Sequence, residues 1–258
     1  MNNTNEYAAQ ILSLIDLTSL NANDTDQSII NLCHKANTHY GNVAAICIYS
    51  HYIPLAQKVF AEIKQNIKIA TVVNFPDGLP DMDKALYETE LAIKRGAQEI
   101  DIVFPYHSLK NGDSELGYNM ISKVKNLCKN KVLKVIIESG ELKTPELIQI
   151  ASEISIAAGA DFIKTSTGKS LINATIHAAE TILNTIKTSG KKCGFKASGG
   201  IKTIAEAIQY IELANKIMGC AWVNSSNFRF GASSLLENVL LPLSQNNFAK
   251  NKFDNVSI

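Results

Sequence analysis

The sequence predicts a single α/β domain over residues 1–258, folded as a (β/α)8 barrel of the TIM type. Its 258 residues are the usual length of one such barrel. Eight short segments have the character of strands, and several are continuous apolar runs, which is typical of parallel strands covered on both faces. Helical patterns lie between them with a repeat of about 30 residues, as in β-α units with short loops. A doubly wound open sheet is the alternative.

The expected strands combine an apolar stretch with polar or glycine residues that begin the next turn. The first is short and ends in polar residues, and the last leads directly into a helix that starts near Ser233. The strands are expected in LIDLT (14–18), VAAICIY (43–49), IKIATVVNFP (67–76), QEIDIVFP (98–105), LKVIIESG (133–140), GADFIKTS (159–166), CGFKASGG (193–200) and at 227–231.

The expected helices have apolar residues at helical spacing. The first covers 5–15, and the second runs from Asp24 to His39 with Asp24 as its N-cap. From about residue 245 the chain is polar and unpatterned, so we expect a flexible tail there. The other helical patterns occupy 83–96, 121–130, 144–159, 173–190 and 203–215, and Gly96, Gly159 and Gly190 are expected to end three of them.

Composition and charge exclude several classes of protein. Hydrophobic residues make up 46% of the chain and charged residues 19%, which predicts a large core and excludes a mainly disordered protein. The formal net charge is +1, and no run of Lys and Arg is dense enough for a nucleic-acid partner. The same balance is compatible with a small anionic ligand.

The cysteines and the N-terminus predict a cytoplasmic protein. The five cysteines form no Cys-x-x-Cys pair, which is typical of reduced thiols, and Cys47 is expected to be a small core residue. The N-terminus lacks the pattern of a signal peptide, and no segment is long enough to cross a membrane. The histidines show no metal-ligand spacing, so neither a metal nor another cofactor is expected.

Lys164 is the first candidate for chemistry. It interrupts the apolar segment DFIKTSTGKS, and the alternation of a strand places it on the same face as Phe162 and Ser166. A lysine that enters an interior loses hydration, so an inward Lys at the end of a strand is a candidate amine nucleophile. The alternative is a lysine whose charged end reaches solvent at the strand end.

Two further charged residues interrupt apolar strands. Lys196 lies in GFKAS and Asp101 lies in EIDIVF. If Lys164 and Lys196 point into the barrel from neighbouring strands, their like charges and their desolvation lower the pKa of one amine. Asp101 could balance the remaining charge or move a proton through a water. The alternative is a buried Lys–Asp pair that only stabilises the barrel.

Glycine-rich turns after three successive strands predict a phosphate site. They are Gly168-Lys169, Ser198-Gly199-Gly200 and Gly231-Ala232-Ser233-Ser234, the last at the start of a helix. Glycine lets the backbone approach an anion closely, and a helix N-terminus offers unpaired N–H groups. Barrels often bind phosphate with the loops after their seventh and eighth strands.

The motifs FIKTSTGK, EIDIVFP, VNFPDG and GFKASGGI together resemble those of the deoxyribose-phosphate aldolase family, which are class I aldolases with a TIM-barrel fold. The resemblance runs from about LIDLTSLN to FRFGASSLL, nearly the whole chain. It implies reversible cleavage of 2-deoxy-D-ribose 5-phosphate to D-glyceraldehyde 3-phosphate and acetaldehyde, without a metal or other cofactor. It also makes a homodimer a reasonable expectation.

The resemblance implies a role for each candidate residue. Lys164 corresponds to the amine that forms the Schiff base, and Lys196 and Asp101 correspond to the pair that transfers protons. Asp16 and Thr18 are implied to line the sugar pocket, with Asp16 also holding the amine of Lys196. The implied phosphate site consists of Gly168, Lys169, Gly199, Gly200, Ser233 and Ser234.

The chain departs from the family pattern at two places. It ends in Asn255-Val256-Ser257-Ile258, where several members of this length end in a tyrosine that reaches the active site. Ser50-His51 stands where a Pro-Arg pair is common. These departures argue against a catalytic role for the tail and leave the loop after the second strand unassigned.

Two other functions are weighed against the first. They are a class I aldolase or transaldolase acting on another phosphorylated sugar, and a sugar-phosphate binding protein without turnover.

Overall fold

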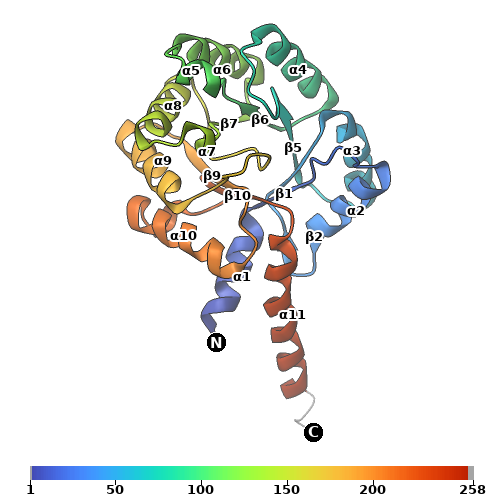
Figure 1. Cartoon of the computed structure of the whole chain (residues 1–258). Coiled ribbons are helices and arrows are strands. Elements are labelled where there is room, and N and C mark those ends of the chain that lie inside the picture. The colour runs from blue at the N-terminus through green and yellow to red at the C-terminus, as the bar shows by residue number, and fades with distance from the viewer. Residues whose placement is uncertain (1, 255–258) are drawn as a thin grey trace.

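A computed structural model describes residues 2–254 of the chain, and its centre is a closed barrel of eight parallel strands ringed by helices (Figure 1). The strands follow the order β1-β10-β9-β8-β7-β6-β5-β4 around the barrel. Because β1 pairs with both β10 and β4, the sheet has no free edge. The predicted TIM barrel is therefore confirmed, and the open sheet is excluded.

Every predicted strand segment overlaps a barrel strand. Most of the observed strands are shorter than the predicted segments because the polar and glycine residues at their ends belong to loops, whereas the last strand has the predicted length and lies one residue later. They are β1 (Ile15–Thr18), β4 (Ala45–Ile48), β5 (Lys68–Val73), β6 (Glu99–Val103), β7 (Val132–Ile136), β8 (Phe162–Lys164), β9 (Gly194–Ser198) and β10 (Phe228–Ala232).

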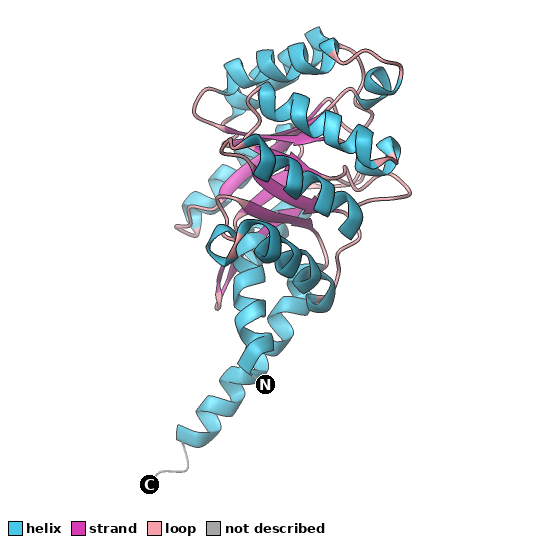
Figure 2. Ribbon diagram, turned by 90° about the vertical axis from the view of Figure 1, so that its left-hand side faces the viewer, coloured by secondary structure: helices cyan, strands magenta, loops and turns pink. Residues whose placement is uncertain are grey.

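The helices form the outer layer and cover the strands on the side away from the barrel axis (Figures 1 and 2). The sequence predicts most of them, but it predicts no helix between β4 and β5, where α3 lies, and neither of the short helices α5 and α7. The helices are α1 (Asn2–Leu14), α2 (Asp26–Ala36), α3 (Ile53–Glu62), α4 (Met82–Arg95), α5 (Tyr106–Lys110), α6 (Glu115–Cys128), α7 (Ser139–Leu142), α8 (Pro145–Ala157), α9 (Ile176–Ser189), α10 (Ile204–Met218) and α11 (Leu235–Asp254), with short 3-10 turns η1 (Ser50–Tyr52) and η2 (Cys220–Trp222).

Helix α2 is shorter at both ends than predicted. Thr25, not Asp24, is the N-cap, because its hydroxyl accepts a hydrogen bond from the Ser28 backbone N–H. Asp24 instead accepts hydrogen bonds from the hydroxyl of Ser19 and the backbone N–H of Asn21, which closes the loop after β1. At the other end the chain leaves the helix for a two-stranded ribbon, β2 (Asn37–Thr38) with β3 (Gly41–Asn42).

The glycines near the helix ends behave as predicted, with one small shift. Gly96 and Gly190 are the C-caps of α4 and α9 and have left-handed φ angles of 100° and 62°. Helix α8 ends at Ala157 with Ala158 as its C-cap, and Gly159, with φ of 95°, is the next residue. The left-handed residue therefore follows each helix within two positions and turns the chain back toward the barrel.

Helices α1 and α11 pack against each other at one side of the barrel, and α11 extends away from its body (Figures 1 and 2). Helix α11 runs to Asp254 and so includes most of the segment in which the sequence predicts a flexible tail. Residues 255–258, where the family tyrosine is missing, lie outside the described residues. The flexibility of the tail stays a prediction.

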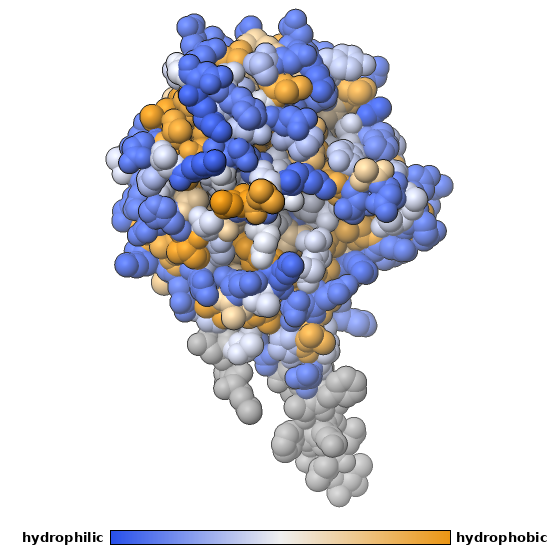
Figure 3. Space-filling view, viewed as in Figure 1, coloured by the Kyte–Doolittle hydropathy of each residue, from blue (hydrophilic) through white to orange (hydrophobic). Residues whose placement is uncertain are grey.

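The surface on the side shown in Figure 3 is mainly polar, with apolar side chains scattered in small groups. None of the helices within residues 2–254 combines the length and the apolar character needed to span a bilayer.

Candidate active site

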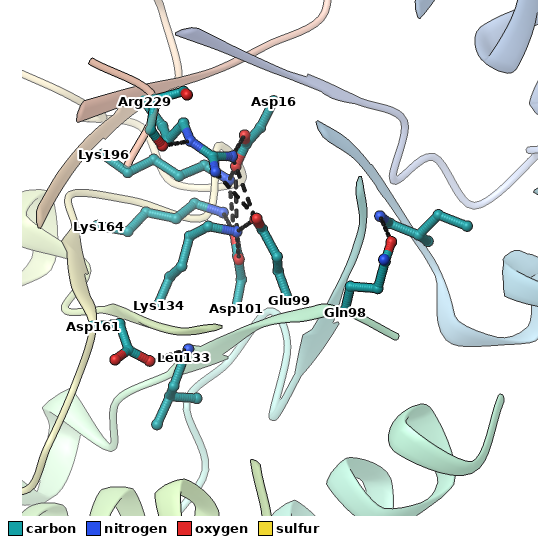
Figure 4. Close-up of polar contacts among 12 residues, drawn as sticks. Asp16, Gln98, Glu99, Asp101, Leu133, Lys134, Asp161, Lys164, Lys196 and Arg229 are labelled. Carbon is teal, nitrogen blue, oxygen red and sulfur yellow. Dashed lines mark hydrogen bonds and ion pairs between the residues drawn. The ribbon is translucent and has the colours of Figure 1, made fainter. Parts of the chain in front are cut away.

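The centre of the barrel holds an unusual number of buried charged side chains. Lys164 on β8 and Lys196 on β9 are paired residues of neighbouring strands, so both side chains project from the same face of the sheet. Asp101 reaches the same space from β6, and Asp16 reaches it from β1 (Figure 4). All four side chains are buried, and Lys164, the most accessible, is only 2% exposed.

Asp101 connects the two predicted lysines. Its Oδ2 atom accepts hydrogen bonds from Lys164 Nζ at 2.9 Å and from Lys196 Nζ at 2.8 Å. Lys196 Nζ also donates to Asp16 Oδ2 at 2.5 Å. The structure therefore brings Lys164, Lys196, Asp101 and Asp16 into one cluster, and Asp16 lies within hydrogen-bonding distance of the amine of Lys196.

Three members of this cluster were not identified from the sequence: Lys134 on β7, Glu99 on β6 and Arg229 on β10 (Figure 4). Lys134 Nζ lies 2.5 Å from Glu99 Oε2, 2.9 Å from Asp101 Oδ1 and 3.3 Å from Asp16 Oδ2. The Arg229 guanidinium lies 2.6 Å from Asp16 Oδ1 and 3.1 Å from Glu99 Oε1. The signal that could have found them is the one used for Asp101, a charged residue inside an apolar strand.

The cluster contains four cationic groups and three carboxylates, so its formal charge is +1 when every lysine is protonated. The loss of one proton makes it neutral. The carboxylates are shared unequally, since Lys134 has three as neighbours and Lys196 and Arg229 have two each. Lys164 has only Asp101, so it is the lysine that releases its proton most readily.

The directions of the pKa shifts agree with the number of carboxylate neighbours of each lysine. The pKa of Lys164 is lowered by burial and by the repulsion of Lys196. The attraction of Asp101 raises it, but not enough to offset these two effects. Burial also acts to lower the pKa of Lys196, but Asp101 and Asp16 outweigh it and raise that pKa above its usual value. Burial would raise the pKa of Asp101, but Lys134, Lys164 and Lys196 hold it well below the usual range. Of these two amines, that of Lys164 therefore loses its proton more readily, and it does so beside an ionised carboxylate.

A cleft of about 280 Å³ opens at the carboxyl ends of β1, β8, β9 and β10. Thr18 lines this cleft, whereas Asp16, two residues earlier on β1, is buried in the cluster. The cleft brings together every residue of the predicted phosphate site, namely Gly168, Lys169, Gly199, Gly200, Ser233 and Ser234.

The backbone of the cleft has the conformation that glycine permits. Gly168, Gly199 and Gly200 have φ angles of 83°, 84° and 84°. At Gly199 a Cβ atom would also lie 2.7 Å from Asn173, so a side chain there meets both backbone strain and a close contact. Ser233 and Ser234 precede α11, which begins at Leu235, two residues after Ser233, near which the helix start was predicted. The N-terminus of α11 therefore follows directly on the cleft.

Glu138 ties two of the loops at this end of the barrel together. It follows β7, is 1% exposed, and accepts a hydrogen bond at its Oε2 atom from the backbone N–H of Thr167 at 3.1 Å. Burial raises the pKa of its carboxyl group. Thr167 precedes Gly168 and Lys169, so Glu138 positions the loop that brings these two residues to the cleft. Lys169 Nζ in turn donates to the backbone oxygen of Leu20 at 2.8 Å.

Cys47 is packed in the core, and the loop after β4 is held by a hydrogen bond. Cys47 is buried with Leu20 and Ala70, as predicted for a small core residue. Ser50 begins η1, and its hydroxyl accepts a hydrogen bond from Arg95 at 2.8 Å. Among residues 2–254, no group of three or more His, Cys, Asp or Glu side chains is arranged to hold a metal ion.

The comparison with protein families gives one match over most of the chain. The model of the DeoC/LacD family aldolases matches residues 10–238.

Solved structures with this fold agree with that match. A protein of Coccidioides immitis, provisionally assigned as a deoxyribose-phosphate aldolase, is 28% identical with a TM-score of 0.80, over 91% of this chain and 86% of that one. The deoxyribose phosphate aldolase from Aeropyrum pernix, described as a tetramer, is 25% identical with a TM-score of 0.75, over 95% of this chain and 94% of that one. A Toxoplasma gondii ME49 protein with the same provisional assignment has a TM-score of 0.85 at 23% identity, over 93% of this chain and 96% of that one, which supports the fold alone.

Proposed function

The chain belongs to the DeoC/LacD family of aldolases, and we propose that within it this protein is a class I deoxyribose-phosphate aldolase. It would cleave 2-deoxy-D-ribose 5-phosphate reversibly to D-glyceraldehyde 3-phosphate and acetaldehyde. The observation that carries the proposal is the pairing of the two lysines. Lys164 has one carboxylate neighbour, Asp101, and shares it with Lys196. The cluster that contains them becomes neutral when one lysine loses its proton. A neutral amine is the form that adds to an aldehyde.

In the proposed reaction, the Lys164 amine adds to the C1 aldehyde of the open-chain sugar, and the resulting carbinolamine loses water to form an iminium ion. The iminium draws electrons from the C2–C3 bond. When a base removes the proton of the C3 hydroxyl, this bond breaks, C3 becomes the aldehyde of glyceraldehyde 3-phosphate, and C1 and C2 remain on Lys164 as an enamine. Protonation of C2 and addition of water then release acetaldehyde and restore the amine.

Asp101 and Lys196 are proposed to move the protons in these steps. Asp101 Oδ2 lies within hydrogen-bonding distance of both amines, so a proton that leaves one can pass through this carboxylate. Lys196 is held protonated by Asp101 and Asp16, so it is suited to donate a proton to the departing hydroxyl of the carbinolamine. Asp16 fixes the position of the Lys196 amine from the opposite side.

The cleft after β8, β9 and β10 is proposed to bind the 5-phosphate. Lys169 supplies a positive charge, and Gly168, Gly199 and Gly200 leave room for an anion close to the backbone. Ser233 and Ser234 supply hydroxyl groups next to the N-terminus of α11, where unpaired N–H groups favour an anion. Thr18 lines the same cleft and would contact the sugar.

The test is to incubate the protein with 2-deoxyribose 5-phosphate and measure the release of acetaldehyde and glyceraldehyde 3-phosphate. The proposal predicts both products and condensation of the two in the reverse direction. Turnover with a different phosphorylated sugar, and none with this one, would favour an aldolase or transaldolase of other specificity. Binding of the sugar phosphate without any turnover would favour a binding protein.

Assembly and location remain predictions. The family resemblance makes a homodimer a reasonable expectation and the sequence predicts a cytoplasmic protein, while the A. pernix protein is described as a tetramer. Light scattering of the purified chain would distinguish a dimer from a tetramer or a monomer.

A further inference from the structure

The end of the barrel opposite the cleft also has a cavity. It measures about 640 Å³ and is lined by residues at the amino ends of six strands, from Lys68 on β5 to Arg229 on β10. The cleft beside Lys169, at the carboxyl ends, measures about 280 Å³. The larger cavity is within the size range of small-molecule sites and is not used by the proposed aldolase reaction.

The lining of this amino-end cavity is strongly cationic. Two carboxylates, Glu99 and Asp161, face six basic side chains: Lys68, Lys125, Lys129, Lys131, Lys192 and Arg229. The lining therefore has a formal charge of +4, whereas the whole chain has +1. This opening therefore carries a larger net positive charge than the chain as a whole.

Both carboxylates of the lining are already engaged. Asp161 pairs with Lys125 at 2.5 Å, and Glu99 pairs with Arg229 and with the buried Lys134. Among the side chains of residues 4–245, no carboxylate forms an ion pair with the four other lysines of the lining. Their charges are therefore available to a ligand.

The base of the cavity is rigid. The Arg229 side chain is 8% exposed and is held by Asp16, by Glu99 and by the backbone oxygen of Ser225. The four lysines come from three segments that approach one another at the opening: Lys68 starts β5, Lys129 and Lys131 lie in the turn before β7, and Lys192 lies in the turn before β9. Several lysines around a fixed arginine form a concave site and not an extended basic stripe.

We propose that this amino-end cavity is a second binding site, which takes a small phosphorylated anion that carries three or more negative charges, such as a chain of three phosphates. A single phosphate would leave most of the four unpaired lysines without a partner. A nucleic acid needs a basic track along the surface, whereas these charges converge on one cavity. The four lysines are separate from the cleft, because they lie at the opposite end of the barrel, whereas Arg229 and Glu99 line the cavity and also belong to the ion cluster.

The experiment is isothermal titration calorimetry of the full chain with inorganic tripolyphosphate at fixed ionic strength. A Lys169→Ala background removes the main cation of the cleft, so binding there does not obscure the second site. We expect one binding event in this background. Replacing Lys129, Lys131 and Lys192 together by Gln should then weaken binding by about tenfold or more.

A matched control removes the same charge elsewhere. Lys58, Lys94 and Lys216 are exposed lysines on α3, α4 and α10, and their joint replacement by Gln should change the dissociation constant by less than about twofold. Unchanged binding in the Lys129, Lys131 and Lys192 variant would overturn the proposal. An equal loss in both triple variants would also overturn it, because it would mean diffuse attraction without a site. Aldolase turnover of both variants, measured with Lys169 intact, verifies that they are folded.

Discussion

Lys164 differs from the other buried cations in having a single carboxylate neighbour. Lys134 and Lys196 are equally buried but remain charged, because each lies against two or more carboxylates. Burial alone therefore does not select the nucleophile. The selection comes from how Asp16, Glu99 and Asp101 are distributed among the cations.

The charge count predicts an effect of Arg229, which is outside the cleft. Arg229→Gln removes one positive charge, so the cluster becomes neutral with all three lysines protonated. The pKa of Lys164 should then rise, and kcat/KM should require a higher pH. A pH–rate profile tests this, with Arg229→Lys as the charge-preserving control. A lower rate with an unshifted profile would mean that Arg229 is only structural.

Lys169 should act on binding of the phosphate and not on the chemistry. Lys169→Ala is expected to raise KM for 2-deoxyribose 5-phosphate by about tenfold to a hundredfold, the usual effect of losing a hydrogen bond to a charged group. With unphosphorylated 2-deoxyribose the same variant should resemble the wild type. An equal loss with both sugars would count against a phosphate role for Lys169.

The sequence identified some members of the cluster and missed others for a physical reason. Lys164, Lys196 and Asp101 stand out as single charges in apolar strands, and their family motifs point to the same residues. Glu99 and Arg229 are 130 positions apart in sequence and meet only because the barrel closes β1 onto β10. The alternation of a strand shows which face a side chain occupies, but it does not show which charges meet.

At the scale of elements, continuous apolar runs located several of the eight strands, because both faces of each strand are covered, and the last strand was located from the helix that follows it. Element ends were less predictable, because they depend on individual hydrogen bonds. Asp24 and Thr25 are both good N-cap residues. Asp24 is engaged by Ser19 and Asn21 across the loop after β1, which leaves the cap to Thr25.

The contact between the loops after β7 and β8 gives a prediction for Glu138. Glu138→Ala removes the acceptor for the Thr167 N–H, so the loop with Gly168 and Lys169 should lose its fixed position. We expect a raised KM for the phosphorylated sugar, by about fivefold to tenfold. Glu138→Gln keeps an acceptor oxygen and should restore KM to near the wild-type value. If the Gln and Ala variants were equally impaired, the hydrogen bond would not be the cause.

At the scale of the whole molecule, the ion cluster lies across the centre of the barrel and joins six of its eight strands: β1, β6, β7, β8, β9 and β10. Such a cluster is stable only as a complete set, because each buried charge depends on its partners. The family match and the closed barrel are consistent with one another over nearly the whole chain.

Removal of Asp101 should therefore destabilise the whole fold. Asp101→Asn leaves three buried lysines with less compensation, and we expect the free energy of unfolding to fall by about 3–5 kcal/mol, as measured by urea denaturation. The exposed pair of Lys35 with Glu237 is the control, and Glu237→Gln should change it by less than about 1 kcal/mol. Similar effects of the two substitutions would contradict the view that the cluster stabilises the barrel.

The central claim, that Lys164 is the nucleophile, is tested most directly by borohydride reduction of the protein mixed with 2-deoxyribose 5-phosphate, followed by peptide mass mapping. The reduction converts a Schiff base into a stable amine. We predict an ethyl group on Lys164 from the acetaldehyde fragment, and no adduct in Lys164→Ala. An adduct on Lys196 would contradict the charge argument, and a folded wild-type protein with no adduct would contradict the Schiff-base mechanism.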